Sequence, residues 1–183
     1  MRLDREKAVL IVIDVQERLM PAIDGAEGIT RNLERLVRGA HLLGVPVILT
    51  EQYVKGLGPT VAPLRHALEE TAGYRPIEKS CFSAYGCAPF TEQLGALGRR
   101  QAIVAGVETH VCVYQTALDL AASGAEVTIV ADAAGSRTAE NKEIALRRLV
   151  AEGVKLSSTE MVLFEMTVAS GTDEFRAISK LVK

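Results

Sequence analysis

Three side chains in this 183-residue sequence have types that could carry covalent chemistry: Asp14, Lys79 and Cys112. A thiolate is a strong nucleophile, a nearby carboxylate can act as general base, and an ammonium group favours both negative charges. Cys112 lies in the segment QAIVAGVETHVCV, residues 101–113, where a continuous apolar run changes to helical spacing. We expect the start of a helix to lower the pKa of this thiol, because free N–H groups and the helix dipole stabilise an anion.

Each of these residues also has an ordinary structural interpretation. A buried cysteine can be inert, an aspartate after a strand often caps a turn, and a single lysine is usually exposed to solvent. His110 could serve as a base for Cys112, although we favour an exposed or pocket-lining position, because residues two apart on a helix do not face each other. Cys81 and Cys87 have no histidine nearby, so we do not expect a zinc site there.

The elements that must position these residues alternate along the chain. Short β-branched apolar runs are separated by segments with an apolar residue every three or four positions, which predict helices. The runs that predict strands are Ala8–Ile13, Val45–Leu49, Tyr74–Lys79, Ala102–Ala105, Val127–Val130 and Val154–Ser157. Predicted helices contain the stripes from Ile29 to Leu43, Phe90 to Leu97, Val113 to Ala121, Ile144 to Val150 and Phe175 to Leu181. Glycines 44, 124 and 153 are expected to end helices just before strands, and Thr172 to cap the last helix.

This alternation predicts a single domain over residues 1–183 with a Rossmann-like α/β fold. Apolar strands between helices indicate a three-layer, doubly wound sandwich with a six-stranded parallel sheet. With the strand order 3-2-1-4-5-6, a crevice opens between strands one and four, at their carboxyl ends. Asp14 and Cys112 then lie on its two sides, whereas Lys79 starts about 10 Å away and must reach across with its own length. The long segment Glu51–Arg75 has only a short helical stretch and is expected to be functional or an interface.

Composition excludes several classes of function. The net charge is −2 and no basic cluster exceeds two arginines, so we do not expect nucleic-acid binding. No apolar run approaches about 18 residues, so we expect no membrane partner. The apolar run near the N-terminus is too short for a signal peptide, and an odd number of cysteines without a C-x-x-C pair predicts reduced thiols in a cytoplasmic protein. Strand one is followed by Asp-Val-Gln and not by a dinucleotide fingerprint, so we expect no cofactor.

Three segments in order, VLIVIDVQ with Asp14, EKSCFSA with Lys79 and GVETHVCV with Cys112, resemble the isochorismatase-like cysteine hydrolase superfamily. The segments TEQYVKGLGPT and ETHVCVYQTALDL are most similar to its metal-free, isochorismatase-domain-containing hydrolases. The resemblance implies the 3-2-1-4-5-6 sheet and a catalytic triad of Asp14, Lys79 and Cys112. It also implies a cis peptide bond before Glu108, which would direct the Glu108 N–H, with that of Cys112, into an oxyanion hole.

The same resemblance implies the surroundings of the site. Residues expected to line the substrate pocket are Gln16, Tyr53, Phe82 and Tyr85. Nicotinamidases carry an Asp-x-His zinc motif after strand two, whereas this sequence reads Thr50-Glu51-Gln52-Tyr53, so we expect no metal. Relatives further imply a homo-oligomer in which Glu51–Arg75 and Met161–Met166 pack between subunits.

The resulting hypothesis is a hydrolase that cleaves a small amide or related C–N bond through a thioester on Cys112. One alternative is an isochorismate-type vinyl-ether hydrolase, in which proton transfer from Asp14 dominates. The other is a non-catalytic or redox-responsive module, in which Cys112 is only an oxidisable thiol. The sequence does not specify the substrate.

Overall fold

The computed structural model describes residues 2–183 and contains one six-stranded parallel sheet. Its order is β3-β2-β1-β4-β5-β6, which confirms the expected doubly wound α/β fold. The strands are β1 (Ala8–Ile13), β2 (Val47–Gln52), β3 (Ile77–Lys79), β4 (Gln101–Val107), β5 (Glu126–Gly135) and β6 (Lys155–Ser157). All six predicted strands are present, and the third is shorter than expected, because it pairs with β2 only over its last residues, from Ile77 to Lys79.

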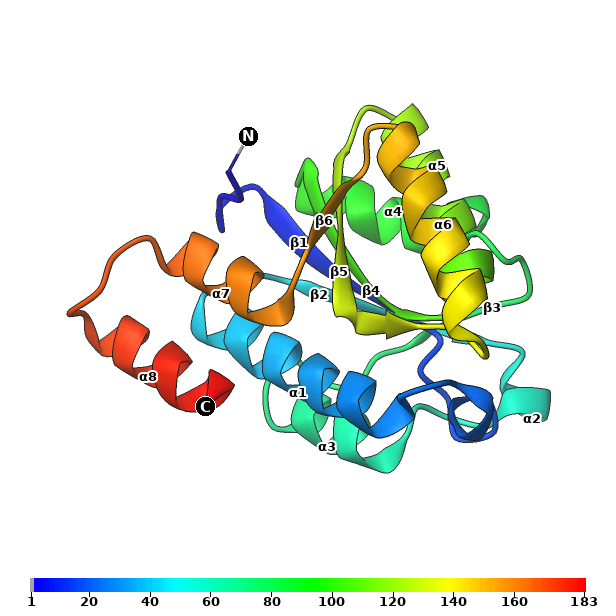
Figure 1. Cartoon of the computed structure of the whole chain (residues 1–183), viewed down its shortest axis with the longest axis horizontal. Helices are drawn as coiled ribbons and strands as arrows, with labels where there is room; N and C mark the ends of the chain where they lie inside the picture. The colour runs from blue at the N-terminus through cyan, green and yellow to red at the C-terminus, as the bar shows by residue number, and fades with distance from the viewer. Residues whose placement is uncertain (1) are drawn as a thin grey trace.

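Helices cover both faces of this sheet (Figure 1). One layer contains α1 (Ala26–Leu42), α3 (Ala62–Glu69), α7 (Thr159–Thr167) and α8 (Asp173–Val182). The other contains α4 (Ala88–Leu97), α5 (Tyr114–Ala122) and α6 (Ala139–Ala151). The short helix α2 (Val54–Leu57) and the 3-10 turns Met20–Ala22 and Ala84–Gly86 lie in the connections. No helix in residues 2–183 is long and apolar enough to cross a membrane.

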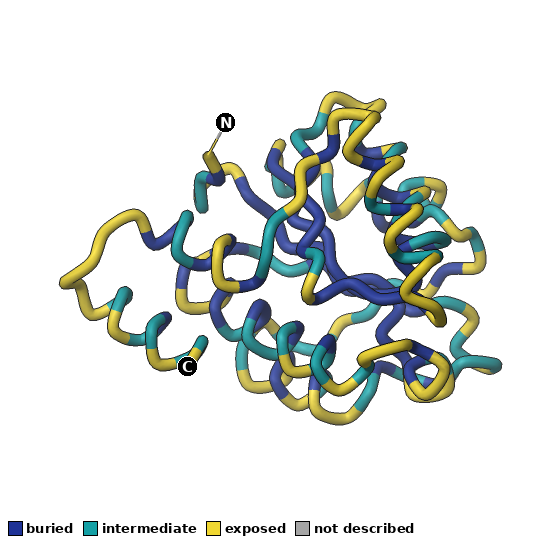
Figure 2. The backbone as a smooth tube through the Cα atoms, in the orientation of Figure 1, coloured by how far each residue is buried: buried dark blue, intermediate teal, exposed yellow. Residues whose placement is uncertain are grey.

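The central strands are buried on both faces, as the dark tube through the middle of the molecule shows (Figure 2). In β1, the side chains of Ala8, Leu10 and Val12 face the core under α1, whereas Val9, Ile11 and Ile13 face the core under α4 and α5. Both sets are apolar, which explains the continuous apolar run in the sequence. The predicted stripe of α1 is buried as expected from Ile29 to Ala40.

The predicted helix ends agree with the structure. Glycines 44, 124 and 153 have φ angles of 68°, 90° and 85°, in the left-handed region that favours glycine after a helix. The Thr172 hydroxyl accepts a hydrogen bond from the Phe175 N–H at 3.0 Å and caps α8. These local signals therefore fixed the boundaries between helices and strands.

The structure refines the expectations for two segments. The segment Glu51–Arg75 is largely structured, because it contains the end of β2 and the helices α2 and α3. The run Met161–Met166 lies within α7, and Val162, Leu163 and Met166 are buried in the core of the chain itself. Met161 is 59% exposed, and the packing of this run between subunits stays a prediction.

The carboxyl ends of β1 and β4 approach each other unusually closely. Ile13 pairs with Gly106, and a Cβ atom at Gly106 would lie 2.1 Å from the Ile13 carbonyl oxygen. Gly106 also has φ +115°, which L side chains rarely adopt. Directly after β1, Asp14 has a positive φ of 53° and turns the chain out of the sheet. This junction places Asp14 beside the segment that leads to Cys112.

Candidate active site

A buried ion pair joins two of the three predicted residues. The Lys79 ammonium donates a hydrogen bond to Asp14 Oδ2 at 2.7 Å, and both side chains are 0% exposed. The other carboxylate oxygen, Asp14 Oδ1, accepts a hydrogen bond from the Thr50 hydroxyl at 2.7 Å. An ion pair in a low-dielectric interior persists only when further hydrogen bonds satisfy its remaining groups, and here Thr50 supplies one of them.

The remaining bonds of Lys79 fix its ammonium group from several directions. Gln52 Oε1 accepts a hydrogen bond from Nζ at 2.7 Å, and the carbonyl oxygens of Cys81 and Phe82 lie at 3.2 Å from it. Lys79 ends β3 opposite Gln52, so its side chain reaches Asp14 past the end of β2. The lysine side chain therefore spans the expected separation between the end of β3 and the crevice, and the carbonyl oxygens of the following loop hold its ammonium group there.

Cys112 lies close enough to this ion pair for both charges to affect its thiol. The pKa of Cys112 is raised to about 12, first because the thiol is buried and second because of the Asp14 charge, while Lys79 acts in the opposite direction. The expected lowering of this pKa is wrong. Cys112 lies in a π-helical turn, Thr109–Val113, ahead of α5, and burial outweighs the stabilisation expected from a helix start.

Glu108 begins the turn that carries Cys112. The structure has the expected cis peptide bond between Val107 and Glu108. The Glu108 carboxylate accepts hydrogen bonds from Arg137 Nε at 2.9 Å and Nη2 at 2.7 Å, and from the Arg137 backbone N–H at 3.2 Å. These bonds to Arg137 lower the pKa of Glu108, although burial opposes the effect. Arg137 follows β5, so this pair ties the turn to the end of the neighbouring strand.

The four residues predicted to line the pocket differ in their surroundings. Gln16 is fully buried, donates to the Gln52 and Gly58 carbonyl oxygens at 2.9 and 2.6 Å, and accepts from the Gln52 N–H at 2.7 Å. Its amide therefore joins loops and is already occupied by backbone partners. By contrast, Tyr53 and Phe82 are 62% and 55% exposed, and Tyr85 is half-buried.

Sequence reasoning missed two side chains at the end of β2. Thr50 and Gln52 hold Asp14 and Lys79 respectively, and Gln52 also donates to the Ser80 carbonyl oxygen at 2.8 Å. Polar residues that end a central strand were the available signal, because parallel strands meet at one edge of the sheet. His110 is half-buried, and its Nδ1 lies 3.0 Å from Ser136 Oγ.

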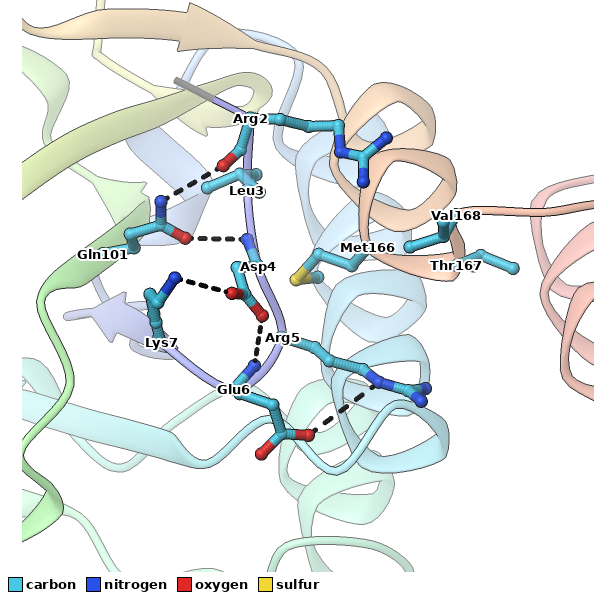
Figure 3. A pocket seen from close by; sticks show the side chains of 10 residues that line it. All are labelled: Arg2, Leu3, Asp4, Arg5, Glu6, Lys7, Gln101, Met166, Thr167 and Val168. Atoms are coloured by element: carbon cyan, nitrogen blue, oxygen red, sulfur yellow. Dashed lines mark hydrogen bonds and ion pairs between the residues drawn. The ribbon is translucent and has the colours of Figure 1, made fainter.

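The remaining candidate features are a metal site and a cavity far from Asp14, Lys79 and Cys112. Within residues 2–183, no group of three or more His, Cys, Asp or Glu side chains is arranged to hold a metal ion. A cavity of about 530 Å³ lies at the opposite end of the sheet, where Lys7 precedes β1 and Gln101 begins β4 (Figure 3). Its polar groups largely bind one another: the Gln101 amide bonds to the Asp4 N–H and the Arg2 carbonyl oxygen, and Asp4 pairs with Lys7.

The fold and the buried Asp–Lys pair beside a cysteine define an isochorismatase-like α/β protein, and comparison with known proteins agrees. Residues 8–161 match the Isochorismatase domain family. Isochorismatase domain-containing protein 2 of Danio rerio is 38% identical over 182 residues, covering 99% of this chain and 89% of the relative. The chain therefore belongs to the isochorismatase family, whose members are generally hydrolases.

Solved structures with this fold cover nearly the whole chain. A structure described as MAR1 ribonuclease from Caenorhabditis elegans has a TM-score of 0.91 and 33% identity, covering 100% of this chain and 92% of that one. YcaC from Escherichia coli, described as an octameric hydrolase of unknown specificity, has a TM-score of 0.90 and 25% identity, with 99% and 90% coverage. YcaC from Pseudomonas aeruginosa, described with covalent acrylamide, has a TM-score of 0.89 and 26% identity, with 98% and 91% coverage.

Proposed function

We propose that this protein hydrolyses a small amide or related C–N bond through a thioester on Cys112. The observation that carries the proposal is the fully buried Asp14–Lys79 pair beside the Cys112 thiol. A buried ion pair costs desolvation energy and is weak evidence for stability, so its position next to a nucleophile favours a chemical role. Asp14 is the base, Cys112 the nucleophile, and Lys79 holds the carboxylate in place.

The first half-reaction follows from the protonated state of the thiol. Because the pKa of Cys112 is about 12, the thiol keeps its proton at neutral pH. Asp14 therefore takes the proton while Sγ forms a bond to the carbonyl carbon and the carbonyl electron pair moves onto oxygen. When this intermediate collapses, the C–N bond breaks and Asp14 returns the proton to the leaving nitrogen. The products of this half-reaction are an amine and a Cys112 thioester.

Water completes the cycle. Asp14 takes a proton from the attacking water as its oxygen bonds to the thioester carbon. The C–S bond then breaks, the sulfur recovers the proton, and a carboxylic acid is released. In both half-reactions, negative charge develops on the carbonyl oxygen. We assign the backbone N–H groups of Glu108 and Cys112 as donors to that oxygen, a type of stabilisation worth about 3 kcal/mol per donor.

The relatives support the class of reaction and leave the substrate open. The Pseudomonas YcaC is described with covalent acrylamide, an electrophile that nucleophiles attack at its alkene carbon, so it supports a reactive nucleophile in a relative and says nothing of amide cleavage. The ribonuclease description belongs to the Caenorhabditis elegans protein, and it makes RNA a useful comparison substrate. We also propose that this chain forms a homo-oligomer, as an octameric relative suggests, and light scattering that shows only a monomer would refute this.

A substrate panel with matched cysteine variants tests the mechanism. Small amides, ureas, hydroxamates and an RNA oligonucleotide are incubated with the wild type, Cys112→Ala and Cys87→Ala. Cys87 is a half-buried cysteine at the start of α4 and serves as the control. We expect Cys112→Ala to lower turnover of any cleaved amide by a factor on the order of 10⁴ or more, and Cys87→Ala to retain it.

The covalent intermediate has its own test. An activated ester should add one acyl group per chain, and peptide mass mapping should place it on Cys112. Acylation of Cys81 or Cys87 instead, or unchanged amide turnover by Cys112→Ala, would refute the proposed mechanism.

A further inference from the structure

A second, smaller cavity lies beside the turn that carries Cys112. It has a volume of about 210 Å³ and is lined by His110, Tyr114, Asn141, Ile144, Ala145 and Arg148. The lining comes from the turn Thr109–Val113, the start of α5 and one face of α6. Asp14, Lys79 and Cys112 do not line this cavity, so it is distinct from the candidate active site.

The cavity contains a cation with no carboxylate partner within residues 2–183. The Arg148 guanidinium carbon lies 4.9 Å from the centre of the Tyr114 ring, a cation–π contact that orients the guanidinium group and leaves its N–H groups free to bind an anion. The adjacent arginine differs, because Arg147 forms an ion pair with Glu143 at 2.5 Å on the exposed side of α6. Arg148 is thus held in place by an aromatic ring, whereas Arg147 is bound to an acid.

The other groups around the cavity suit a small anion with an apolar part. Asn141 and His110 supply polar groups, and His110 Nδ1 is already paired with Ser136 Oγ at 3.0 Å. Ile144 and Ala145 supply an apolar wall, and Ile144 is 49% exposed, so part of this wall is open to solvent.

One acidic group near His110 is already paired with a cation. Glu108 interacts with His110 through its charge, but its carboxylate is bound by Arg137 through two side-chain hydrogen bonds. Glu108 does not line the cavity, so a ligand there meets the Arg148 guanidinium with no carboxylate among the lining residues.

We propose that this cavity binds a small carboxylate, with its charged group on Arg148 and its short aliphatic or aromatic part against Ile144 and Ala145. The volume is below that of a site for a drug-sized ligand, so the ligand is small. Because His110 and Tyr114 each lie two residues from Cys112, the bound carboxylate contacts the same turn that positions the thiol. The site does not depend on catalysis by Cys112.

Calorimetric titration of the full-length protein tests the site. The probes are acetate, butyrate, benzoate and inorganic phosphate, and the variants are Arg148→Gln and Arg147→Gln, which remove the same charge from adjacent positions on α6. We expect saturable binding of butyrate or benzoate to the wild type, weakened about tenfold or more by Arg148→Gln and changed less than about twofold by Arg147→Gln. The same affinity in Cys112→Ala would show that the site is independent of the proposed thioester chemistry.

Three results would overturn the proposal: no saturable binding of any carboxylate to the wild type, equal affinities for Arg148→Gln and the wild type, or saturable binding of phosphate alone. Kinetics on a cleaved amide then distinguish the sources of the carboxylate. If the site holds a remote carboxylate of the substrate itself, free butyrate or benzoate raises KM without changing kcat. If it holds a separate effector, the free acid changes kcat.

Discussion

Replacing Asp14 by Asn should change two reactions of Cys112 in opposite directions. In the wild type the pKa of Cys112 is about 12, compared with an ordinary value of 9.0, and the Asp14 charge is the second cause after burial. A difference of about three pKa units corresponds to about 4 kcal/mol in favour of the neutral thiol. Asp14→Asn removes the negative charge and leaves the Lys79 ammonium beside the sulfur, so the pKa of Cys112 should fall. The proposed amide hydrolysis, in which the carboxylate is the base, should be lost.

Alkylation by iodoacetamide measures the thiolate directly. With Cys81 and Cys87 replaced by Ser, only Cys112 reacts, and its rate is followed by mass spectrometry from neutral to alkaline pH. Because the thiolate fraction falls tenfold for each pKa unit, wild-type Cys112 should react about 10³-fold more slowly at neutral pH than a free thiol of pKa 9.0. Asp14→Asn should react at least about tenfold faster than the wild type, whereas Lys79→Met should react more slowly.

The effect of removing the Asp14 charge must be separated from loss of the fold. Breaking a buried ion pair by removing one partner costs about 3–5 kcal/mol, so each variant is first checked by circular dichroism and thermal unfolding. The double variant Asp14→Asn/Lys79→Met removes both charges and keeps the test open if the single variant unfolds. A folded Asp14→Asn variant that is alkylated at the wild-type rate or more slowly would refute the assignment of Asp14 as a cause of the high pKa. The double variant is compared with Lys79→Met, and an equal or slower rate in the double variant would refute the same assignment.

Three further predictions concern stability. Because the pKa of folded Cys112 is raised, the protein should lose about 4 kcal/mol as the pH rises from 9.0 to about 12, and Cys112→Ala should lack this part of the loss in urea titrations. Because the pKa of Glu108 is lowered by Arg137, its contribution is present above pH 4.5 and disappears at lower pH, so Glu108→Gln should flatten the acid side of the stability profile. Gly106→Ala should destabilise the protein by more than about 3 kcal/mol in denaturant unfolding, because its Cβ would collide with the Ile13 carbonyl oxygen; a smaller loss would mean that β1 and β4 can separate.

The sheet and the crevice could be predicted because they depend on local patterns. A continuous apolar run such as Ala8–Ile13 is buried on both faces, and helices between such runs impose parallel strands with a switch point. Asp14 ends the first of these runs and Cys112 follows the fourth. Once the strand order is known, these two residues are predicted to lie close together. The approach of Lys79 required more, because it depends on the length of a side chain and on the carbonyl oxygens of the next loop.

The remaining features of the site are set by tertiary contacts that no local pattern contains. Thr50 and Gln52 look like ordinary polar residues at a strand end, and only the sheet register brings them to Asp14 and Lys79. The predicted direction of the Cys112 pKa shift is wrong for a related reason. The helix start is visible in the sequence, whereas the depth of burial and the closeness of Asp14 appear only in the folded chain.

The high pKa of Cys112 is compatible with its proposed role as a nucleophile, because two different proton transfers are involved. Ionisation to solvent adds one negative charge to a buried group, and a pKa of about 12 reports that cost. Transfer to Asp14 adds none: the buried set holds one negative and one positive charge before the transfer, as carboxylate and ammonium, and one of each afterwards, as thiolate and ammonium. Before the transfer, Lys79 is hydrogen-bonded to Asp14 within the set. The carboxylate that suppresses thiolate formation in the resting protein is therefore the group that can remove the proton when a carbonyl carbon arrives.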